Sequence, residues 1–369
     1  MRKTLSLIII CFIFNESKAQ IKFVNEFLNI GVGARAHGMF GSVVANVADP
    51  SAAYWNSSAL TELKSPISVS AMHANWFGDV ANFNYFTIAK RMSAGKAYGA
   101  FSFIRMGIDN IPNTLNIVNS DGTIDFDQVT QFSAYDMAFM LSYAKKLGTA
   151  DKLSLGGSLK VIRRKIGDFG GAWGLGGDFS LTYKISNRLR LGINARDITT
   201  TLNAWSFTLD DEQKDVFLKT GNDVPISSVE TALPRLILGV SYLSSFGSKL
   251  SLLSEIDLNA STNGTQSGIA SGKSFNLDPS AGLELGYANR VFIRAGIGNL
   301  QRIINEVNAT NKVFDFQPNV GLGISLGRLK IDYALANVGN ISGALASHIF
   351  SLNLDLAERK SPDQIEVKE

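Results

Sequence analysis

The sequence predicts an all-β membrane protein, a transmembrane β-barrel of about fourteen antiparallel strands with an N-terminal, partly helical plug segment. Three observations predict it. Hydropathy alternates with a period of two over long segments, and tight turns join these segments at every second connection. In addition, no apolar run after residue 14 reaches the roughly 20 residues that a membrane-spanning helix needs. A chain with 45% hydrophobic residues and no such run must bury its apolar side chains in another way.

The alternation separates an apolar face from a polar one. In residues 131–146, Tyr135, Phe139 and Tyr143 share one face, and Asp136 and Ser142 lie on the other. These strands are longer than the five or six residues that are usual in soluble sheets. We therefore expect the apolar face to meet lipid. A large soluble β-sandwich or solenoid is the alternative fold.

The connections favour a membrane barrel. The strands are expected to begin near Ile67, Ala81, Ala97, Gln131, Lys152, Gly171, Arg188, Pro234, Lys249, Leu277, Arg290, Phe316, Arg328 and Ala346. Tight turns are expected at 93–96, 148–151, 186–188, 246–249, 288–290 and 327–328, and longer connections at roughly 107–130, 200–233, 260–276 and 299–315. Short turns at one end and long loops at the other are typical of bacterial outer-membrane barrels. We assign residues 67–357 to the barrel.

The polar face carries charges of both signs, which suits a lumen, because Arg or Lys facing lipid at mid-depth costs about 2–4 kcal/mol. The inward charges are Lys160, Asp178, Arg190, Arg196, Arg235, Glu255, Asp257, Glu284, Arg294, Lys330 and Asp332. We expect Arg235, Glu255, Asp257, Glu284, Arg294 and Asp332 to hold the plug through ion pairs, with Arg35 of the plug pairing with Asp332, Glu255 or Glu284. Alternatively, the inward charges line a solute path.

The two ends of the chain indicate export. Residues 1–19 combine a basic start, a short apolar run and small residues before Gln20, which predicts a signal peptide cleaved after Ala19. The only cysteine, Cys11, would be removed with it. The polar tail 358–369 is expected to be a disordered periplasmic end. We expect an outer-membrane location, lipid contact and both termini in the periplasm. With 35 Lys+Arg against 32 Asp+Glu, the charge gives no case for nucleic acid.

Residues 20–66 do not alternate and are rich in Ala and Gly, so we expect short helices or turns that fold into the lumen as a plug. A phosphate-binding loop is excluded, because the stretch lacks the strand–loop–helix context and the Lys or acidic partner that such a site needs. The glycines are better explained by close approach of the backbone to the barrel wall.

The stretch Gly31–Leu60 resembles the N-terminal signature of the PorV/PorQ family, outer-membrane barrels of the type IX secretion system of Bacteroidetes within the FadL-like class. The family pattern is matched by Gly33, Ala34, Arg35, Ala36, Gly38, Met39, Gly41, Ala48, Asp49, Trp55, Asn56, Ala59 and Leu60. The sequence departs from the pattern at Phe40, Pro50, Ser57 and Ser58. The resemblance implies a plugged barrel that assists secretion by docking cargo, a translocon component or a surface partner.

The connection 200–233 contains Trp205, Phe207 and Phe217 among charged residues, and its part "DDEQKDVFLKTG" is expected to form a short surface helix ended by Gly221. Aromatic side chains exposed on an extracellular loop would offer a docking surface for a protein. The same side chains would otherwise pack over the mouth of the barrel.

Catalysis and metal binding are not expected. The histidines His37, His73 and His348 are scattered, and no serine or carboxylate can be tied to them from the sequence. We therefore predict no catalytic residue, no metal and no cofactor. The predicted function is a non-enzymatic barrel that assists type IX secretion. The alternative is a FadL-like transporter of hydrophobic small molecules across the outer membrane.

Overall fold

The structure is a computed structural model that describes residues 24–92, 96–115, 117, 123–148, 150–262, 270–271, 275–304, 312–338 and 346–356. The predicted signal peptide and the polar tail 358–369 lie outside the described residues. Within them, no helix is both long enough and apolar enough to cross a membrane.

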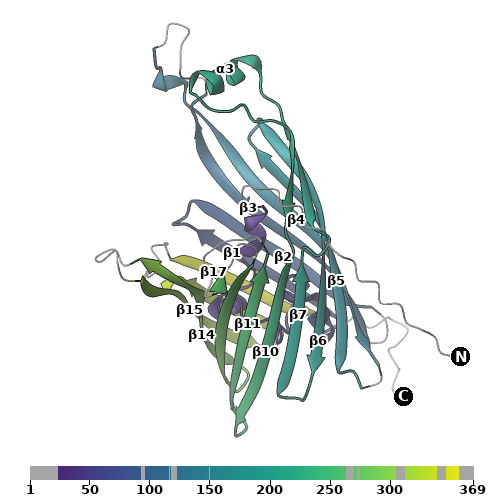
Figure 1. The fold of residues 1–369 in the computed structure, drawn as a ribbon. Helices are drawn as coiled ribbons and strands as arrows, with labels where there is room; N and C mark the ends of the chain where they lie inside the picture. The colour runs from purple at the N-terminus through teal and green to yellow at the C-terminus, as the bar shows by residue number, and fades with distance from the viewer. Residues whose placement is uncertain are drawn as a thin grey trace, which may run out of the picture.

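A single antiparallel sheet closes on itself (Figure 1). Its strands are β1 (Ile67–Trp76), β2 (Ala81–Arg91), β3 (Ala97–Asn113), β4 (Thr130–Leu147), β5 (Leu153–Ile166), β6 (Gly170–Lys184), β7 (Leu189–Arg196), β8 (Thr201–Phe207), β9 (Ser228–Ala232), β10 (Arg235–Phe246), β11 (Leu250–Ser261), β12 (Ala270–Ser271), β13 (Asn276–Tyr287), β14 (Val291–Ile304), β15 (Lys312–Leu326), β16 (Leu329–Ala336) and β17 (Ser347–Leu356). The first strand pairs with the last, from Ile67 opposite Leu356 to Asn75 opposite His348, and this pairing closes the barrel.

The wall contains fourteen strand positions, because β7 and β8 share one, β9 and β10 share one, and the short β12 adds none. Residues 179–184 of β6 pair with β7, and residues 170–175 of the same strand pair with β8. Strands β7 and β8 therefore occupy one strand position, interrupted at residues 197–200. In the same way, β9 pairs with β8 and β10 pairs with β7, so β9 and β10 together occupy the next strand position. The two residues of β12 lie antiparallel beside the start of β13, opposite Leu277 and Asn276, and add no further position to the wall. The predicted barrel is confirmed, and the expected strand starts agree with the structure to within a few residues.

The alternation of the sequence becomes the two faces of the wall. Leu141, Tyr143, Trp173 and Leu175 are exposed on the outside. Between them, small or polar residues such as Ser142 turn inward and are buried. Such an apolar exterior suits hydrocarbon, and a closed sheet leaves no backbone hydrogen-bonding group unpaired at an edge.

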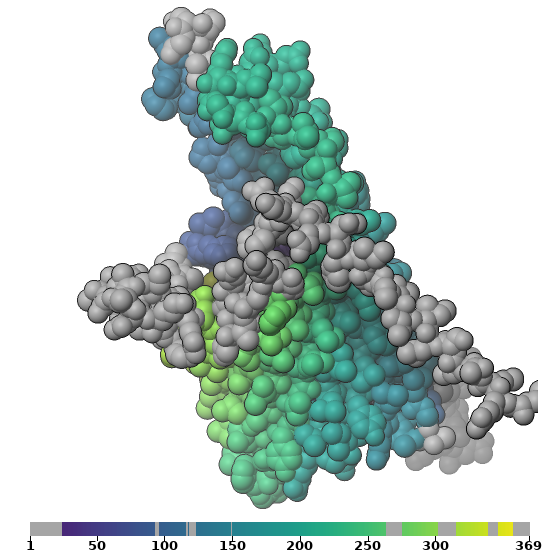
Figure 2. Space-filling view, in the orientation of Figure 1, coloured from purple at the N-terminus to yellow at the C-terminus, as the bar shows by residue number. Residues whose placement is uncertain are grey.

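One side of the barrel is taller than the rest. Strands β3 and β4 have 17 and 18 residues, whereas β16 and β17 have 8 and 10. Figures 1 and 2 show this side rising beyond the remaining rim, with helix α3 (Asp211–Lys219) at its top. The helix starts at an Asp210–Gln213 capping box and is followed by Gly221 at φ 74°, as the sequence predicts.

Residues 24–66, called the luminal segment below, fold inside the barrel as η1 (Glu26–Asn29), α1 (Ala34–Gly38), α2 (Ala52–Trp55) and η2 (Ser57–Glu62). Its apolar side chains form the core with inward side chains of the wall, for example Leu28 and Tyr54 with Phe83 and Met140. Glycines of the wall let the two backbones approach. A Cβ added at Gly296 would lie 2.2 Å from the backbone carbonyl carbon of Met39.

Candidate functional site

An arginine of the luminal segment joins a chain of buried charges in the wall. Arg35 Nε and Nη2 donate to the two carboxylate oxygens of Glu284 at 2.8 and 3.2 Å. Arg294 donates to the same Glu284 at 2.6 Å and to Asp332 at 2.7 Å. Burial by itself lowers the pKa of Arg35, but the Glu284 carboxylate outweighs this effect and the pKa is raised. Of the three partners expected for Arg35, Glu284 is therefore the one in contact.

Two carboxylates of β11 accept hydrogen bonds from backbone amides of the luminal segment. Asp257 Oδ2 accepts from the N–H groups of Val43 and Val44 at 3.1 and 3.2 Å, and Glu255 Oε1 accepts from Ala45 at 2.5 Å. Both carboxylates are buried, with 3% and 1% of their surface exposed. These three hydrogen bonds hold the backbone turn at residues 43–45 against β11.

Arg235, the remaining inward charge of the predicted set, lies 3.4 Å from Glu26 at the start of the luminal segment. Thus Arg235, Glu255, Asp257 and Glu284 touch the segment directly, whereas Arg294 is joined to it through Glu284, and Asp332 through Arg294.

The residues of the predicted plug motif are packing residues of the luminal segment. Gly33 and Gly41 have φ angles of 85° and 74°, which favour glycine. Asp49 accepts from the Ser51 amide at 2.9 Å, just before α2. Trp55 Nε1 donates to the Val32 carbonyl at 2.8 Å, and Asn56 Nδ2 donates to the Val44 carbonyl at 2.7 Å. Two further motif residues, Gly38 and Leu60, are closely packed. A Cβ added at Gly38 would lie 3.0 Å from Gly321 Cα, and Leu60 is fully buried.

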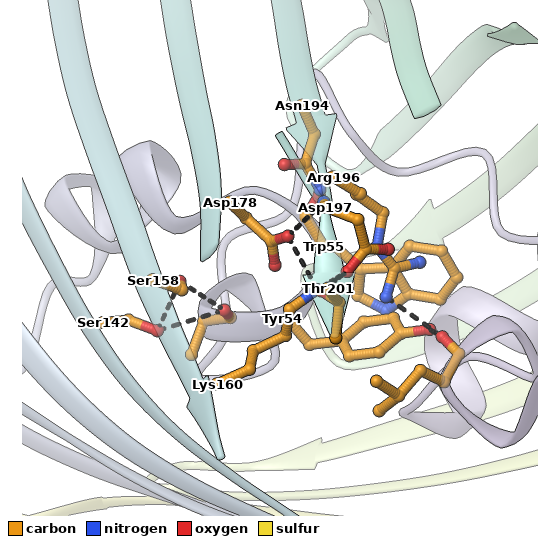
Figure 3. Close-up of polar contacts among 12 residues, drawn as sticks. Tyr54, Trp55, Ser142, Ser158, Lys160, Asp178, Asn194, Arg196, Asp197 and Thr201 are labelled. Atoms are coloured by element: carbon orange, nitrogen blue, oxygen red, sulfur yellow. Dashed lines mark hydrogen bonds and ion pairs between the residues drawn. The ribbon is translucent and has the colours of Figure 1, made fainter. Parts of the chain in front are cut away.

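A second buried network lies where β7 gives way to β8 (Figure 3), and Asp197 is its one charged member that the sequence analysis did not place on the inner face. Lys160 Nζ, 1% exposed, lies 2.8 Å from Asp178 and 2.5 Å from Asp197. Arg196 lies over the Tyr54 ring, 4.4 Å from its centroid, and donates to the Leu28 carbonyl at 3.0 Å. Strand alternation turned Lys160, Asp178 and Arg196 inward, but the interruption that adds Asp197 has no sequence signature.

The luminal segment lies between two cavities. The turn-side cavity, about 430 Å³, is lined by charged side chains such as Arg35 and Glu284, by apolar ones such as Leu253, and by the tight turns near Ser248 and Asn289. The loop-side cavity, about 330 Å³, is lined by His37, Trp55 and Trp76 together with polar side chains of the wall. Among the described residues, the two cavities have no lining residue in common.

A third cavity, the apolar cavity, lies in the tall side of the wall beneath α3 and has a volume of about 290 Å³. Its lining residues are Pro112, Asn113, Thr114, Leu115, Phe132, Ile166, Phe169, Phe207, Leu209, Phe217 and Pro225. The rings of Phe132 and Phe169 meet edge to face at 5.1 Å. Apolar walls with few polar atoms suit a hydrophobic ligand.

The expected extracellular loop 200–233 differs from the structure. Residues Trp205 and Phe207 belong to strand β8, and their rings stack 5.6 Å apart. Trp205 is 9% exposed and donates to Glu230 at 2.8 Å, while Phe207 and Phe217 line the apolar cavity. These three aromatic side chains pack inward, because the tall wall provides an apolar surface that the sequence could not place.

The three histidines have different surroundings, and each contacts a different partner. His73 contacts Asn84 and His348 contacts Tyr333, each at 2.8 Å on the outer face. His37 is buried in the luminal segment, and burial lowers its pKa to about 4. Among the described residues, no group of three or more His, Cys, Asp or Glu side chains is placed to hold a metal ion.

Comparison with solved structures identifies the same fold in known barrels. The chain is similar to the toluene transporter TbuX of Ralstonia pickettii, with a TM-score of 0.51 and 13% identity over 88% of this chain and 98% of that one. It is also similar to CymD, a monoaromatic hydrocarbon channel (TM-score 0.54, 13% identity, 89% and 98% covered). A Pseudomonas aeruginosa FadL homologue matches as well (TM-score 0.51, 13% identity, 88% and 98% covered). The chain therefore has the same barrel fold as these proteins.

No protein-family model matches the chain, and no curated protein sequence matches it. For the resemblance of residues 31–60 to the PorV/PorQ signature, the comparisons support the barrel fold and no finer assignment. Nothing in the comparisons points to type IX secretion.

Proposed function

We propose that this protein is a non-enzymatic outer-membrane channel that admits hydrophobic small molecules. In this proposal the loop end and the tall side face the exterior, and the tight turns and both termini lie in the periplasm. The observation that carries the proposal is the apolar cavity, which the sequence lines with four phenylalanines, Phe132, Phe169, Phe207 and Phe217. The barrels with the same fold that are named as toluene or hydrocarbon transporters support the same substrate class.

The route has a physical order. A hydrophobic molecule first leaves water at the apolar cavity, where burial stabilises it by about 25 cal/mol per Å² of apolar surface. It then meets the luminal segment, which separates the loop-side cavity from the turn-side cavity. Passage therefore requires part of the luminal segment to move away from the charges that hold it.

An uptake assay tests the proposal. The protein is produced in a bacterium whose own outer membrane is poorly permeable to hydrocarbons, and the uptake rate of radiolabelled toluene is compared with that of cells carrying an empty vector. We expect faster uptake, reduced several-fold by Phe169→Asp, which introduces a charge into the apolar cavity. Phe126→Asp is the matched control, because Phe126 is 73% exposed and does not line the cavity. Uptake equal to that of the vector control would refute the channel function.

Secretion is the second candidate function, and one observation favours it. Apolar side chains at the top of the tall side are exposed, among them Phe126, Leu218, Ile226 and Val229, at 73, 65, 75 and 64%. Such a surface suits a protein partner. Affinity purification of the tagged protein from its native membrane, followed by mass spectrometry, tests the secretion function. Co-purified secretion components or secreted proteins would support docking of a protein partner. Isolation of the protein without them would refute the secretion function.

A further inference from the structure

Three basic side chains lie on the outer face of the tall side, among apolar neighbours. They are Arg105 of β3 and Arg163 and Lys165 of β5. Arg105 shares its face with Phe101, and the other two share theirs with Leu159, at 40 and 69% exposed. Because a charged side chain is unfavourable against hydrocarbon, basic residues on this face require a particular place or partner.

The pairing of the strands brings the three side chains together. Arg105 and Arg163 lie in one row of the sheet, with Met137 of β4 between them. Lys165 lies opposite Tyr135, two residues farther from the tight turns. Neighbouring strands are about 4.8 Å apart, so the backbones at Arg105 and Arg163 are about 10 Å apart. The side chains of Arg105, Arg163 and Lys165 therefore form one group, called the basic patch below.

The basic patch lies at the edge of the apolar band of the wall. From Leu153 at the tight turn to Arg163, strand β5 advances ten residues. At about 3.3 Å per residue and a tilt of about 40°, this corresponds to a rise of about 25 Å, the height of the apolar band in membrane barrels. Tyr135 and Trp173 lie beside the patch, as aromatic girdles do at the membrane interface. The patch is thus at the level of the lipid headgroups.

Both guanidinium groups extend away from the apolar band. A Cβ added at Gly107 would lie 2.8 Å from Arg105 Nη1, and a Cβ added at Gly171 would lie 2.6 Å from Arg163 Nη1. These two glycines belong to the row of Lys165, so the guanidinium groups reach the level of the lysine. Long basic side chains that extend in this way keep their charge among the headgroups.

Aromatic rings position the two arginines. The guanidinium carbon of Arg105 lies 5.8 Å from the centroid of the Tyr135 ring, and that of Arg163 lies 5.1 Å from the centroid of the Trp173 ring. Arg163 Nη1 donates to the carbonyls of residues 164 and 172 at 3.1 and 3.2 Å. These contacts fix the direction of each guanidinium group without neutralising its charge.

The charge of the basic patch is poorly compensated within the described part of the chain. There, neither Arg105 nor Arg163 has an acidic partner, and Lys165 lies 3.3 Å from Asp168, whose side chain is fully exposed. An arginine binds a phosphate through two parallel N–H groups, and a lysine binds it as a point charge. The patch is therefore complementary to an anionic phosphate group.

We propose that the basic patch binds the phosphate groups of a glycolipid in the exterior leaflet of the outer membrane. The acyl chains of this lipid lie along the apolar outer face of β3–β6, below the patch. Two guanidinium groups about 10 Å apart, with an ammonium group beside them, suit a headgroup that carries more than one phosphate. The inference rests on the orientation given in the proposed function, which places the tall side at the exterior, and is independent of the molecule that the channel admits.

Binding of one lipid in two phosphorylation states tests the inference. Purified full-length protein in detergent micelles is titrated with diphosphoryl lipid A, with the same lipid after removal of its phosphates, and with phosphatidylglycerol. Native mass spectrometry measures the fraction of protein with bound lipid. A basic side chain near a membrane surface strengthens anion binding about fivefold. We therefore expect diphosphoryl lipid A to bind at least about tenfold more tightly than its dephosphorylated form, and more tightly than phosphatidylglycerol.

A triple variant and a matched control locate the binding. The patch variant replaces the basic patch by glutamine (Arg105→Gln, Arg163→Gln and Lys165→Gln), and its preference for the phosphorylated lipid should fall to about twofold or less. The control variant removes the same charge from three exposed lysines at the tight-turn end of the same side of the wall (Lys96→Gln, Lys145→Gln and Lys152→Gln), and it should keep the preference.

Two single variants at exposed positions give opposite expectations and report on the patch even if the triple variant does not fold. Lys165, with 37% of its side chain exposed, faces the fully exposed Asp168. Lys165→Gln should weaken the binding of diphosphoryl lipid A about threefold, because it removes one positive charge. Asp168→Asn should strengthen it about twofold, because it removes the carboxylate that competes for Lys165.

Equal affinities for the two forms of lipid A in the wild-type protein would overturn the inference, and so would equally tight binding of phosphatidylglycerol. A preference that persists in the patch variant, or that the control variant loses, would overturn it as well. The same holds if both single variants bind as the wild type does. The channel function fails separately, through toluene uptake at the level of the vector control, so the two failures are distinguishable.

Discussion

The ion pair between Arg35 and Glu284 offers the sharpest test of what holds the luminal segment in place. Arg35→Ala removes two hydrogen bonds to a carboxylate, at 2.8 and 3.2 Å, from side chains that are only 16 and 12% exposed. Breaking a fully buried pair costs about 3–5 kcal/mol. Here Arg294 continues to neutralise Glu284 at 2.6 Å, so the Glu284 charge is not left alone. We expect a cost of about 2–3 kcal/mol, which corresponds to about a 30- to 150-fold larger population of displaced luminal segment.

Thiol labelling measures that population. Cys11, the only cysteine, belongs to the predicted signal peptide, so Ser42→Cys places a single thiol in the mature chain at a fully buried position of the luminal segment. When the segment opens and closes quickly, the maleimide labelling rate follows the open population. Arg35→Ala should raise the rate about 30- to 150-fold. Lys214→Ala, which breaks the exposed pair with Asp211, should leave it unchanged. An unchanged rate in Arg35→Ala would refute the view that this pair holds the segment.

Three further outcomes follow from the packing of the luminal segment. Burial lowers the pKa of His37 to about 4, so on acidification the unfolded chain takes up a proton at this histidine before the folded protein does. The free energy of unfolding should therefore fall by up to about 3 kcal/mol between pH 6.5 and 4. In urea denaturation, His37→Gln should lose this part of the pH dependence. In Gly296→Ala the added Cβ would lie 2.2 Å from a backbone carbon, so thermal unfolding should show a loss of at least about 2 kcal/mol. In Gly157→Ala the nearest atom would be 3.4 Å away, and no such loss is expected. Equal losses in the two variants would contradict the close approach of the backbones at Gly296. Lys160→Met leaves the buried Asp178 and the partly buried Asp197 without their cation and should cost about 3–5 kcal/mol in the same assay. Lys165→Met, at a partly exposed lysine, should cost less than about 1 kcal/mol.

The barrel could be predicted from the sequence because its information is local. Each strand carries its own alternation, and each tight turn follows directly from its residues. Inward charges such as Glu255 and Glu284 could be placed for the same reason, since the parity of a position within a strand decides its face. The position of Trp205 could not be predicted from the sequence. Its place in the wall depends on how far the wall rises, and that height is set by the lengths of strands β3–β6.

The choice of contacts required the tertiary structure. Three acidic residues were equal candidates for Arg35, and only the curvature of the closed sheet brings Glu284 within 2.8 Å. Two motif residues, Trp55 and Asn56, reveal their role only when Val32 and Val44 fold back onto them. The lining of the loop-side cavity includes Trp76 of the first strand and Asn259 of β11, residues that share no local pattern.

The sequence by itself thus determined a membrane barrel with a non-strand segment before its first strand, because hydropathy periodicity and turn chemistry act over a few residues. The tertiary structure alone decided which wall side chains meet the luminal segment and where β7 is interrupted. Those contacts join residues that the closure of the sheet brings together across as many as 317 positions, as in the bond from the Ala34 amide to Ser351 Oγ.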